Sequence, residues 1–391
     1  MTSYLMPTYD PLPISFDRGE GSWLIDKDNN YYLDALAGIA VSAVGHGHPK
    51  LTAAISEQAH KLLHTSNIVT IPQQIKLAEK ICTLAKMSQA FFCNSGAEAN
   101  ECAIKLARMY GHKNNIDNPQ IIVTEKAFHG RTMATISASG NRKVQAGFEP
   151  LVEGFLRVPF NDIDAVIELS KNNKNIVAIL LEPIQGEGGL HVPDDDYLPK
   201  LREICTQNKW LFMLDEIQSG IGRTGTWFGH QHYKNAIPDV MTLAKGLGGG
   251  IPIGACLTHG PANNLFEFGN HGTTFGGNPL CCHAANTVLD IIEENNLCAN
   301  AAKLGEKLIS GLKEVTRDLP QVIDIRGQGL WVGIELNRPC REILKIALKH
   351  GVLFSVTALN TIRLAPPLNF TDEQVEILLD KLPKIISEFG A

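Results

Sequence analysis

Short, nearly continuous apolar runs recur through the middle of the chain and alternate with segments that have helical spacing of apolar residues. The five runs are AFFCN (90–94), IIVTE (121–125), IVAILLEP (176–183), LFMLDE (211–216) and VMTLA (240–244). Strands that are covered on both faces of a parallel sheet are apolar in this way. Their alternation with helices predicts an α/β fold built on a large, mainly parallel sheet.

The two ends of the chain have a different pattern. Near the N-terminus, the DNN turn signal in WLIDKDNNYYLDAL lies between two apolar runs and predicts a hairpin. Residues 278–294 and 301–316 have the pattern of long helices, and VIDIRGQGLWVGIEL that of a second hairpin. We therefore expect a large domain over residues 46–294 and a smaller α+β domain over 295–391. The N-terminal arm and strands, 1–45, should join the smaller domain.

Local signals mark several helix ends. Thr371 can cap the last helix together with Gln374, three residues on, and Pro383 should kink or divide that helix. GHGHP, which ends at Pro49, has the His-x-His spacing of some metal sites. No thiolate or carboxylate completes such a site, so we predict a turn before a helix and no metal.

The composition narrows the class of protein. A chain of 391 residues with 44% hydrophobic content can bury a large core. Its formal charge of −6 is dispersed, without the basic block typical of nucleic-acid binding. The nine cysteines include no CxxC pair, which fits reduced thiols in the cytoplasm. We find no secretory signal and no apolar stretch of about 18 residues, so we expect no membrane span.

Polar residues follow the apolar runs, where function collects in sheets of this kind. Asp215 ends a strongly apolar run, and a carboxylate there needs a partner, either in a structural ion pair or on a protonated ring nitrogen. Lys245 lies between an apolar run and a cluster of glycines. It is either a surface lysine or an amine in a dry site, where it can lose its proton and bond to a carbonyl.

Two segments could bind an anion. In NSGAEA, Ser95 and Glu98 form a capping-box pattern, and Gly96 leaves the backbone bare at the start of a helix, where amide groups attract phosphate. The alternative is an ordinary capped helix. HGTTFGGNP offers two hydroxyls, Thr273 and Thr274, beside glycines.

Gly220, Gly222 and Gly225 spell the G-x-G-x-x-G fingerprint of dinucleotide-binding proteins. The context argues against that function, because the following TWFGHQHY is a poor helix. Lys245 also stands about 20 residues on, where an acidic residue would be needed. A nicotinamide-dependent oxidoreductase is therefore only a remote alternative.

Further charged residues lie in glycine-bearing or apolar segments. Arg131, close to Phe128 in KAFHGRT, can form a fork for a carboxylate. Glu182 and Glu187, in EPIQGEGG, suit acid–base work or the balancing of arginines. Arg363, in the apolar TIRLAPPLNF, needs a carboxylate from the protein or from a ligand.

One ligand would use all these groups. It has a phosphate, an aromatic ring and a carbonyl that traps lysine, and pyridoxal phosphate fits this description. The helix start at Gly96 would hold the phosphate, and Asp215 would keep the ring nitrogen protonated. Phe128 would cover the ring face and Lys245 would form the Schiff base.

At these motifs the chain resembles the class III (fold type I) pyridoxal-phosphate aminotransferases. The resemblance covers nearly the whole length, with the motifs in order: NSGAEA, FHGRT, EPIQGEGG, DEIQSGIGRTG, LAKGLGGGIPIGA, HGTTFGGNP and RLAPPL. Within the family, the chain is most similar to bacterial acetylornithine aminotransferases.

The resemblance implies a role for each matched position. Lys245 would carry the internal aldimine and shuttle a proton, and Asp215 would pair with the pyridine nitrogen. The other implied cofactor contacts are Ser95, Gly96, Ala97, Phe128, Gln218 and, in the neighbouring subunit of a homodimer, Thr274. The implied substrate contacts are Arg131 and Thr273 for the distal carboxylate, Arg363 for the α-carboxylate of the oxo acid, and Glu187 as a cover for Arg363. Glu182 would have a supporting role.

The implied reaction is transfer of the δ-amino group of N2-acetylornithine to 2-oxoglutarate. Ornithine, succinylornithine, N-succinyl-diaminopimelate and 4-aminobutyrate are the alternative donors. The segment HTSNIVTIP lacks the aromatic hydroxyl that ornithine enzymes bring from this region, which favours an acylated donor.

Overall fold

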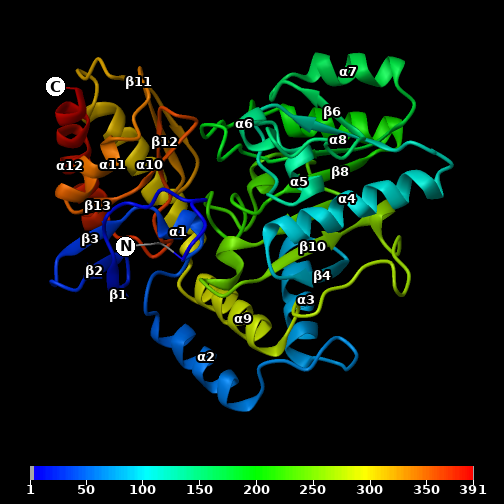
Figure 1. Cartoon of the computed structure of the whole chain (residues 1–391), viewed down its shortest axis with the longest axis horizontal. Helices are drawn as coiled ribbons and strands as arrows, with labels where there is room; N and C mark the ends of the chain where they lie inside the picture. The colour runs from blue at the N-terminus through cyan, green and yellow to red at the C-terminus, as the bar shows by residue number, and fades with distance from the viewer. Residues whose placement is uncertain (1–3, 391) are drawn as a thin grey trace.

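The computed structural model describes residues 4–390 (Figure 1). Its largest sheet has seven strands in the order β4-β10-β9-β8-β7-β5-β6. Their bounds are β4 Gln89–Cys93, β5 Gln120–Thr124, β6 Phe155–Val158, β7 Ile176–Leu181, β8 Leu211–Asp215, β9 Val240–Leu243 and β10 Gly254–Thr258. β10 runs antiparallel to both of its neighbours, and the other pairs are parallel.

All five apolar runs form strands of this sheet, which confirms the predicted α/β fold. The sequence analysis missed β6 and β10. β6, FLRV, is short and carries an arginine, while β10, GACLT, begins with a glycine and two small residues. Neither has the long apolar run that identifies a buried strand from sequence.

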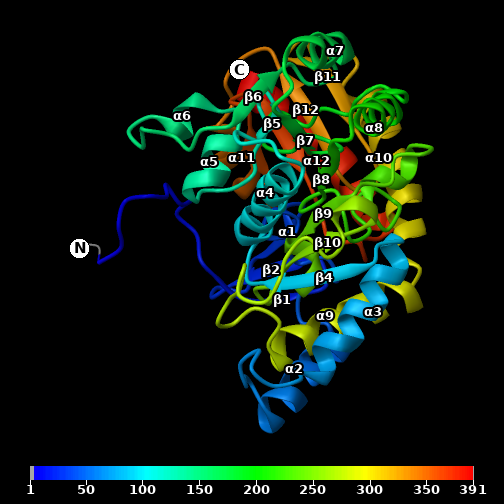
Figure 2. The same cartoon turned by 90° about the vertical axis from the view of Figure 1, so that its right-hand side faces the viewer.

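Helices cover both faces of the large sheet (Figure 2). On one face, α4 (Gly96–Lys113) packs Ala103 and Leu106 against Leu180 of β7. On the other face, α7 (Ile163–Asn172) and α8 (Tyr197–Asn208) pack against Ile179 and its neighbours. Neighbouring residues of one strand thus enter different cores, because successive side chains point to opposite faces of a sheet.

Three further helices flank the β4 edge, and two short ones follow β5. The flanking helices are α2 (Pro49–Lys61), α3 (Pro72–Ala85) and α9 (Pro279–Glu294), and the short ones are α5 (Met133–Ala138) and α6 (Arg142–Gln145). The four-residue segment α1 (Ala37–Ala40) contains non-helical dihedral angles. The turns η1 (Gly229–His232), η2 (Lys245–Gly248) and η3 (Gly260–Ala262) complete this part of the chain.

The C-terminal part has its own antiparallel sheet in the order β11-β12-β15-β14. The strands are β11 Val322–Gly327, β12 Val332–Leu336, β14 Ser355–Thr357 and β15 Thr361–Leu364. Three helices pack with it: α10 Leu297–Val315, α11 Ile343–Lys349 and α12 Asp372–Gly390. β11 and β12 form the second hairpin that the sequence predicts.

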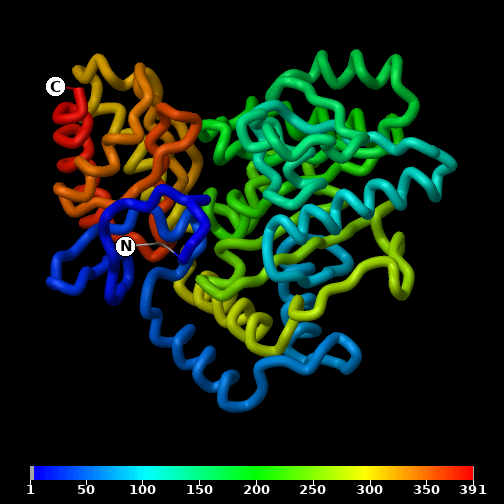
Figure 3. The backbone as a smooth tube through the Cα atoms, viewed as in Figure 1, coloured from blue at the N-terminus to red at the C-terminus, as the bar shows by residue number. Residues whose placement is uncertain are grey.

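The N-terminal strands share a sheet with the C-terminal part. β1 (Phe16–Glu20), β2 (Trp23–Asp26) and β3 (Tyr31–Asp34) form an antiparallel meander, and β3 pairs in parallel with β13 (Val352–Leu353). Figure 3 shows the blue N-terminal tube beside the orange and red tube of the C-terminal part. On this pairing we propose the division into 1–45, 46–294 and 295–391, with the first segment attached to the third.

Two local predictions about the last helix have different outcomes. Thr371 and Gln374 form the reciprocal capping bonds, with the Thr371 amide donating to Gln374 Oε1 at 3.0 Å and the Gln374 amide to Thr371 Oγ1 at 3.3 Å. Pro383 does not divide α12, which continues past it to Gly390. Leu382, Ile385 and Ile386 are all buried, so packing on both sides of the proline keeps the helix continuous. None of the helices in residues 4–390 is long and apolar enough to cross a membrane.

Gly305 lies where α10 crosses the turn at Gly329. A Cβ at position 305 would come within 2.1 Å of the Gly329 carbonyl oxygen, so the helix would have to move. We expect Gly305→Ala to lower the free energy of unfolding by about 1–3 kcal/mol, as overpacking does. Urea unfolding measures the change.

Ser310→Ala, on the exposed face of the same helix, is the matched control and should change stability by less than about 0.5 kcal/mol. Equal stability of the Gly305 and Ser310 variants would show that the helix is not held at this contact.

Candidate active site

A cavity of about 420 Å³ opens where β4, β8 and β9 end. Its lining combines apolar, cationic and acidic side chains from segments far apart in the sequence. These are Val41, Asn94, Ser95, Gly96, Ala97, Phe128, His129, Gly130, Arg131, Glu182, Asp215, Ile217, Gln218, Ala244, Lys245, Gly250, Ile251, Pro252 and Ile253. The sheet thus brings most of the predicted site residues to one place.

The start of α4 forms one wall of the cavity. Ser95 is the N-cap, and its Oγ accepts a hydrogen bond from the Glu98 amide at 3.2 Å. The predicted capping box is wrong in its second bond, because the Glu98 carboxylate accepts from the Asn94 amide at 2.6 Å and does not bond to Ser95. Gly96 and Ala97 line the cavity at the positive end of this 18-residue helix, a position that favours an anion.

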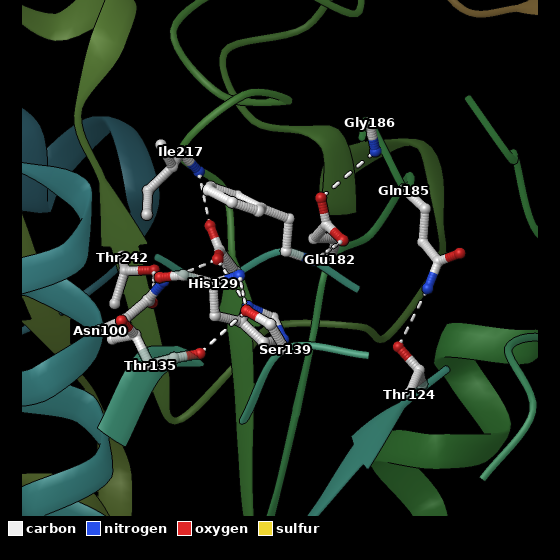
Figure 4. Close-up of polar contacts among 12 residues, drawn as sticks. Asn100, Thr124, His129, Thr135, Ser139, Glu182, Gln185, Gly186, Ile217 and Thr242 are labelled. Atoms are coloured by element: carbon white, nitrogen blue, oxygen red, sulfur yellow. Dashed lines mark hydrogen bonds and ion pairs between the residues drawn. The ribbon is translucent and has the colours of Figure 1, made fainter. Parts of the chain in front are cut away.

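Asp215 is 4% exposed, and three donors surround its carboxylate. Asn100 Nδ2 donates to Oδ2 at 2.7 Å, His129 Nδ1 lies 2.8 Å from the same oxygen, and the Ile217 amide donates to Oδ1 at 3.1 Å. The three donor residues, Asn100, His129 and Ile217, are labelled in Figure 4. These hydrogen bonds replace the water that the carboxylate loses on burial.

The sequence analysis missed the residues that hold Asp215 in place. The Asn100 amide is oriented by Thr242, whose Oγ1 donates to Asn100 Oδ1 at 2.8 Å. Asn100 also donates to the His129 carbonyl at 2.8 Å. The signal was present, because Asn100 and Thr242 are single polar residues in buried faces of a helix and a strand, both 0% exposed.

Lys245 follows β9 in a left-handed backbone conformation, with φ of 42°. Its Nζ has no hydrogen-bond or ion-pair partner within residues 4–390. Burial lowers the pKa of this amine to about 8; the Glu187 carboxylate acts against the shift and the Arg363 charge acts with it. A substantial fraction of the amine is therefore neutral near pH 8, the form that can bond to a carbonyl carbon.

Glu182 is buried, with 3% exposure. Its carboxylate accepts from the backbone amides of Phe128 and Gly186, each at 3.2 Å (Figure 4). Burial raises the pKa of Glu182 to about 7, although the nearby His129 acts in the opposite direction. The side chain fixes the backbone that carries Phe128, since both of its oxygens bond to main-chain amides.

Arg363 and Glu187 form an ion pair beside the cavity. Arg363 Nη1 donates to Glu187 Oε1 at 2.5 Å and to Gln218 Oε1 at 3.2 Å. Only Gln218 of these three lines the cavity itself. Burial raises the pKa of Glu187, but the charges of Arg363 and Lys245 outweigh it and hold that pKa below its usual value.

Arg131 lies exposed at the mouth of the cavity, with its guanidinium carbon 5.6 Å from the centre of the Phe128 ring. Thr273 and Thr274 do not line the cavity of this chain. Thr273 Oγ1 accepts a hydrogen bond at 3.2 Å from Nδ2 of Asn94, which does line the cavity. Thr274 is exposed.

The residues present fit pyridoxal phosphate. The cavity offers a helix start for the phosphate, a buried and hydrogen-bonded carboxylate for a ring nitrogen, an aromatic ring, and an amine with a lowered pKa. The dinucleotide-like segment 220–225 is followed by turns and no helix begins there, so the requirement for nicotinamide binding is not met.

Comparison with known proteins agrees with this site. The family model "Aminotransferase class-III" matches residues 4–386. The chain belongs to this family. Because class-III aminotransferases depend on pyridoxal phosphate, the chain is a pyridoxal-phosphate-dependent enzyme, as the sequence predicts.

Similar proteins are aligned over nearly their whole length. The acetylornithine aminotransferase of Nitrosomonas europaea is 54% identical, over 99% of this chain and 98% of that protein. Acetylornithine aminotransferase 1 of Bordetella bronchiseptica is 49% identical, over 100% of this chain and 99% of that protein. Among solved structures, the acetylornithine aminotransferase of Elizabethkingia anophelis has a TM-score of 0.89 and 34% identity, over 98% of this chain and 96% of that one. The ornithine aminotransferase of Toxoplasma gondii has a TM-score of 0.95 and 30% identity, over 99% of this chain and 93% of that one.

Glu182 gives a prediction about stability and pH. Its folded-state pKa of about 7 lies above the usual 4.5, so the folded protein keeps a proton that the unfolded chain loses between these values. Stability should therefore fall as pH rises through this window and level off above it, by roughly 3 kcal/mol in total for this group.

Glu182→Gln removes that dependence. Because a glutamine side chain has only one accepting oxygen, the variant loses one of the two hydrogen bonds from the backbone. This loss lowers its stability by the same amount at every pH, so the test is how the stability difference from wild type changes with pH. We expect the stability difference between wild type and variant to shrink from about pH 5 to about pH 8, measured by urea unfolding. Glu125→Gln, at an exposed residue directly after β5, is the control, and its stability difference from wild type should not change with pH in this way. Parallel curves for wild type and Glu182→Gln would contradict the raised pKa.

Proposed function

We propose that the enzyme transfers the δ-amino group of N2-acetyl-L-ornithine to 2-oxoglutarate, giving N-acetyl-L-glutamate 5-semialdehyde and L-glutamate. This reaction belongs to arginine biosynthesis. The observation that carries the proposal is the full-length identity of 54% and 49% to proteins named acetylornithine aminotransferase. The charged residues of the site are consistent with substrates of this kind.

When bound, pyridoxal phosphate supplies an aldehyde that takes up the amino group and a ring that accepts the electron pair of a broken C–H bond. We propose that Gly96 and Ala97 bind its phosphate through their amides, with Ser95 beside them. Phe128 covers the ring and Gln218 contacts the ring hydroxyl. Asp215, oriented by hydrogen bonds from Asn100 and the Ile217 amide, would pair with the ring nitrogen.

Lys245 is the proposed acid–base group. Its amine has no other partner in the described chain, and its lowered pKa lets it take a proton from the substrate carbon near neutral pH. Once protonated, Lys245 Nζ would hold this proton beside the bound cofactor. The partial burial of Lys245 restricts competing exchange of this proton with water.

Two arginines suit the two carboxylates of the oxo acid. We propose that Arg131 binds the distal carboxylate, with Thr273 near it, and that Arg363 binds the α-carboxylate. An ω-amino donor has no carboxylate for Arg363, and Glu187 then covers it at the observed 2.5 Å. The oxo acid must displace Glu187, which is 33% exposed in its side chain and therefore has room to move.

We propose that the active unit is a cytoplasmic homodimer in which Thr274 of each chain reaches the phosphate site of the other. Thr274 is exposed and lies outside the cavity of its own chain. Large apolar side chains are exposed on the same loop and near it, with Phe268 at 109%, Phe275 at 62% and Ile68 at 91%. Such a patch is typical of a surface that a partner covers. The nine cysteines, all within the described residues, form no disulfide, which fits a reducing compartment.

Absorbance titration of the purified enzyme tests the donor. We expect N-acetylornithine, without oxo acid, to convert the bound cofactor from its aldehyde form to its amine form at concentrations at least about tenfold lower than ornithine or 4-aminobutyrate need, a difference of about 1.4 kcal/mol. If ornithine converts the cofactor at a lower concentration than N-acetylornithine, the proposed donor is wrong, but the proposed role of Lys245 is unaffected.

Glu187→Gln tests the proposed cover on Arg363. Without the carboxylate, Arg363 remains free to bind α-carboxylates, so α-amino donors such as glutamate should react faster relative to N-acetylornithine. We expect the ratio of the two half-reaction rates to shift by about tenfold, as removal of a partly buried charge pair implies. An unchanged ratio in stopped-flow half-reactions would refute the switch.

A further inference from the structure

Arg363 of β15 has two different neighbours in the C-terminal sheet. It is paired with Ser355 of β14 on one side and with Gly333 of β12 on the other. A Cβ at position 333 would lie 3.1 Å from the Leu190 Cβ, so the β12 side has no room for a polar side chain. The sheet residue that reaches the Arg363 guanidinium is Ser355.

The Arg363 guanidinium is hydrogen-bonded at Nε and Nη1. Nε donates to Ser355 Oγ at 3.1 Å, while Nη1 donates to Glu187 Oε1 at 2.5 Å and to Gln218 Oε1 at 3.2 Å. Nη2 makes no hydrogen bond within residues 4–390. When the Glu187 carboxylate moves away, Nη1 and Nη2 can together bind another carboxylate through two parallel hydrogen bonds.

The bond to Ser355 is the one that does not compete with a ligand. Glu187 has to leave before an α-carboxylate binds, and Gln218 lines the cavity, where we assign it to the ring hydroxyl of the cofactor. Ser355 does not line the cavity. Fixing a long arginine side chain costs rotamer entropy, and a partner that fixes it before the substrate arrives lowers the cost of binding.

The same strand, β14, also holds the backbone of Glu187. Thr357, two residues after Ser355, donates from Oγ1 to the Glu187 carbonyl. Reciprocal backbone hydrogen bonds between Gln185 and His191, each at 3.0 Å, close the loop that carries Glu187. Replacement of Glu187 by a substrate therefore needs movement of its side chain alone, which is 33% exposed.

We propose that Ser355 is a positioning residue for the α-carboxylate of 2-oxo acids and α-amino acids. By accepting from Nε, it keeps the edge of Arg363 formed by Nη1 and Nη2 turned towards the place that Glu187 vacates. The inference rests on the proposed function, in which Arg363 binds the α-carboxylate, and it names the residue that sets the orientation of Arg363.

Ser355→Ala tests this role in the two half-reactions. The amine form of the holoenzyme, made from apoenzyme and pyridoxamine phosphate, is mixed with 2-oxoglutarate, and the aldehyde form is mixed with N-acetylornithine. We expect the half-saturating concentration of 2-oxoglutarate to rise about 3- to 10-fold, with the maximal rate changed less than about twofold, because the lost bond orients Arg363 equally before and during the reaction. The half-saturating concentration of N-acetylornithine should stay within about twofold of wild type, because Glu187 covers Arg363 when this donor binds.

Two further variants make the test specific. Ser355→Thr keeps a hydroxyl on β14 and should restore saturation by 2-oxoglutarate. Thr361→Val is the matched control. Thr361 lies on the same face of the sheet, opposite Thr357 and two residues before Arg363, and its Oγ1 has no hydrogen-bond partner among the described residues. Its replacement should change neither half-saturating concentration.

Arg363→Gln separates failure of this inference from failure of the proposed function. If Arg363→Gln weakens saturation by 2-oxoglutarate and Ser355→Ala does not, Ser355 has no positioning role, while the proposed function stands. An equal rise for 2-oxoglutarate and N-acetylornithine in Ser355→Ala would also overturn the inference, since it indicates a general structural effect. If Arg363→Gln leaves saturation by 2-oxoglutarate unchanged, the proposed role of Arg363 fails, and the inference fails with it.

Discussion

The site depends on a buried negative charge at the end of the central strand β8. A carboxylate at 4% exposure is stable only if donors replace its lost water, and Asp215 has such donors from α4, the 128–131 loop and its own loop. Thr242 of the adjacent strand fixes the Asn100 amide in turn. The strand order, the position of α4 and the loop conformations therefore all place donors at this one carboxylate. Without any one of these donors, the buried charge would be incompletely hydrogen-bonded.

The second constraint is the contact between the two parts of the chain. The loop 186–190 of the large domain is held by the C-terminal sheet through four polar contacts, one of which is the bond from Arg326 Nη2 to the Gly189 carbonyl. Arg326 Nε donates to the Leu190 carbonyl at 2.6 Å, Thr357 Oγ1 donates to the Glu187 carbonyl, and Arg363 pairs with the Glu187 side chain. Because Arg363 and Lys245 lie on different parts, a change in how the parts pack would move a substrate-binding group relative to the acid–base group.

Sequence alone predicted the parallel sheet and most of the cavity, since both depend on local patterns: apolar runs of strand length and polar residues that follow them. It did not predict β10, which depends on neighbours distant in the chain, or the capping bond of Glu98, whose partner is the Asn94 amide four residues earlier and not Ser95. β10 is a strand only through pairing with β4 and β9 on either side. Glu98 Oε2 accepts from both the backbone amide and the side-chain amide of Asn94, at 2.6 and 2.9 Å. Asn100 and Thr242 show that a lone polar residue in a buried face is itself a signal.

The conformation of Lys245 follows from these constraints. The amine must leave β9 at the cavity edge, while the chain must turn at once to reach β10, which runs antiparallel beside it. A left-handed residue at the strand end achieves both, and η2 with its glycines then completes the reversal. Lysine is an unfavourable residue for this backbone, whereas glycine would adopt it without strain. The strain is tolerated because no other residue type supplies an amine at this point, so the sequence departs from local preference where the chemistry requires it.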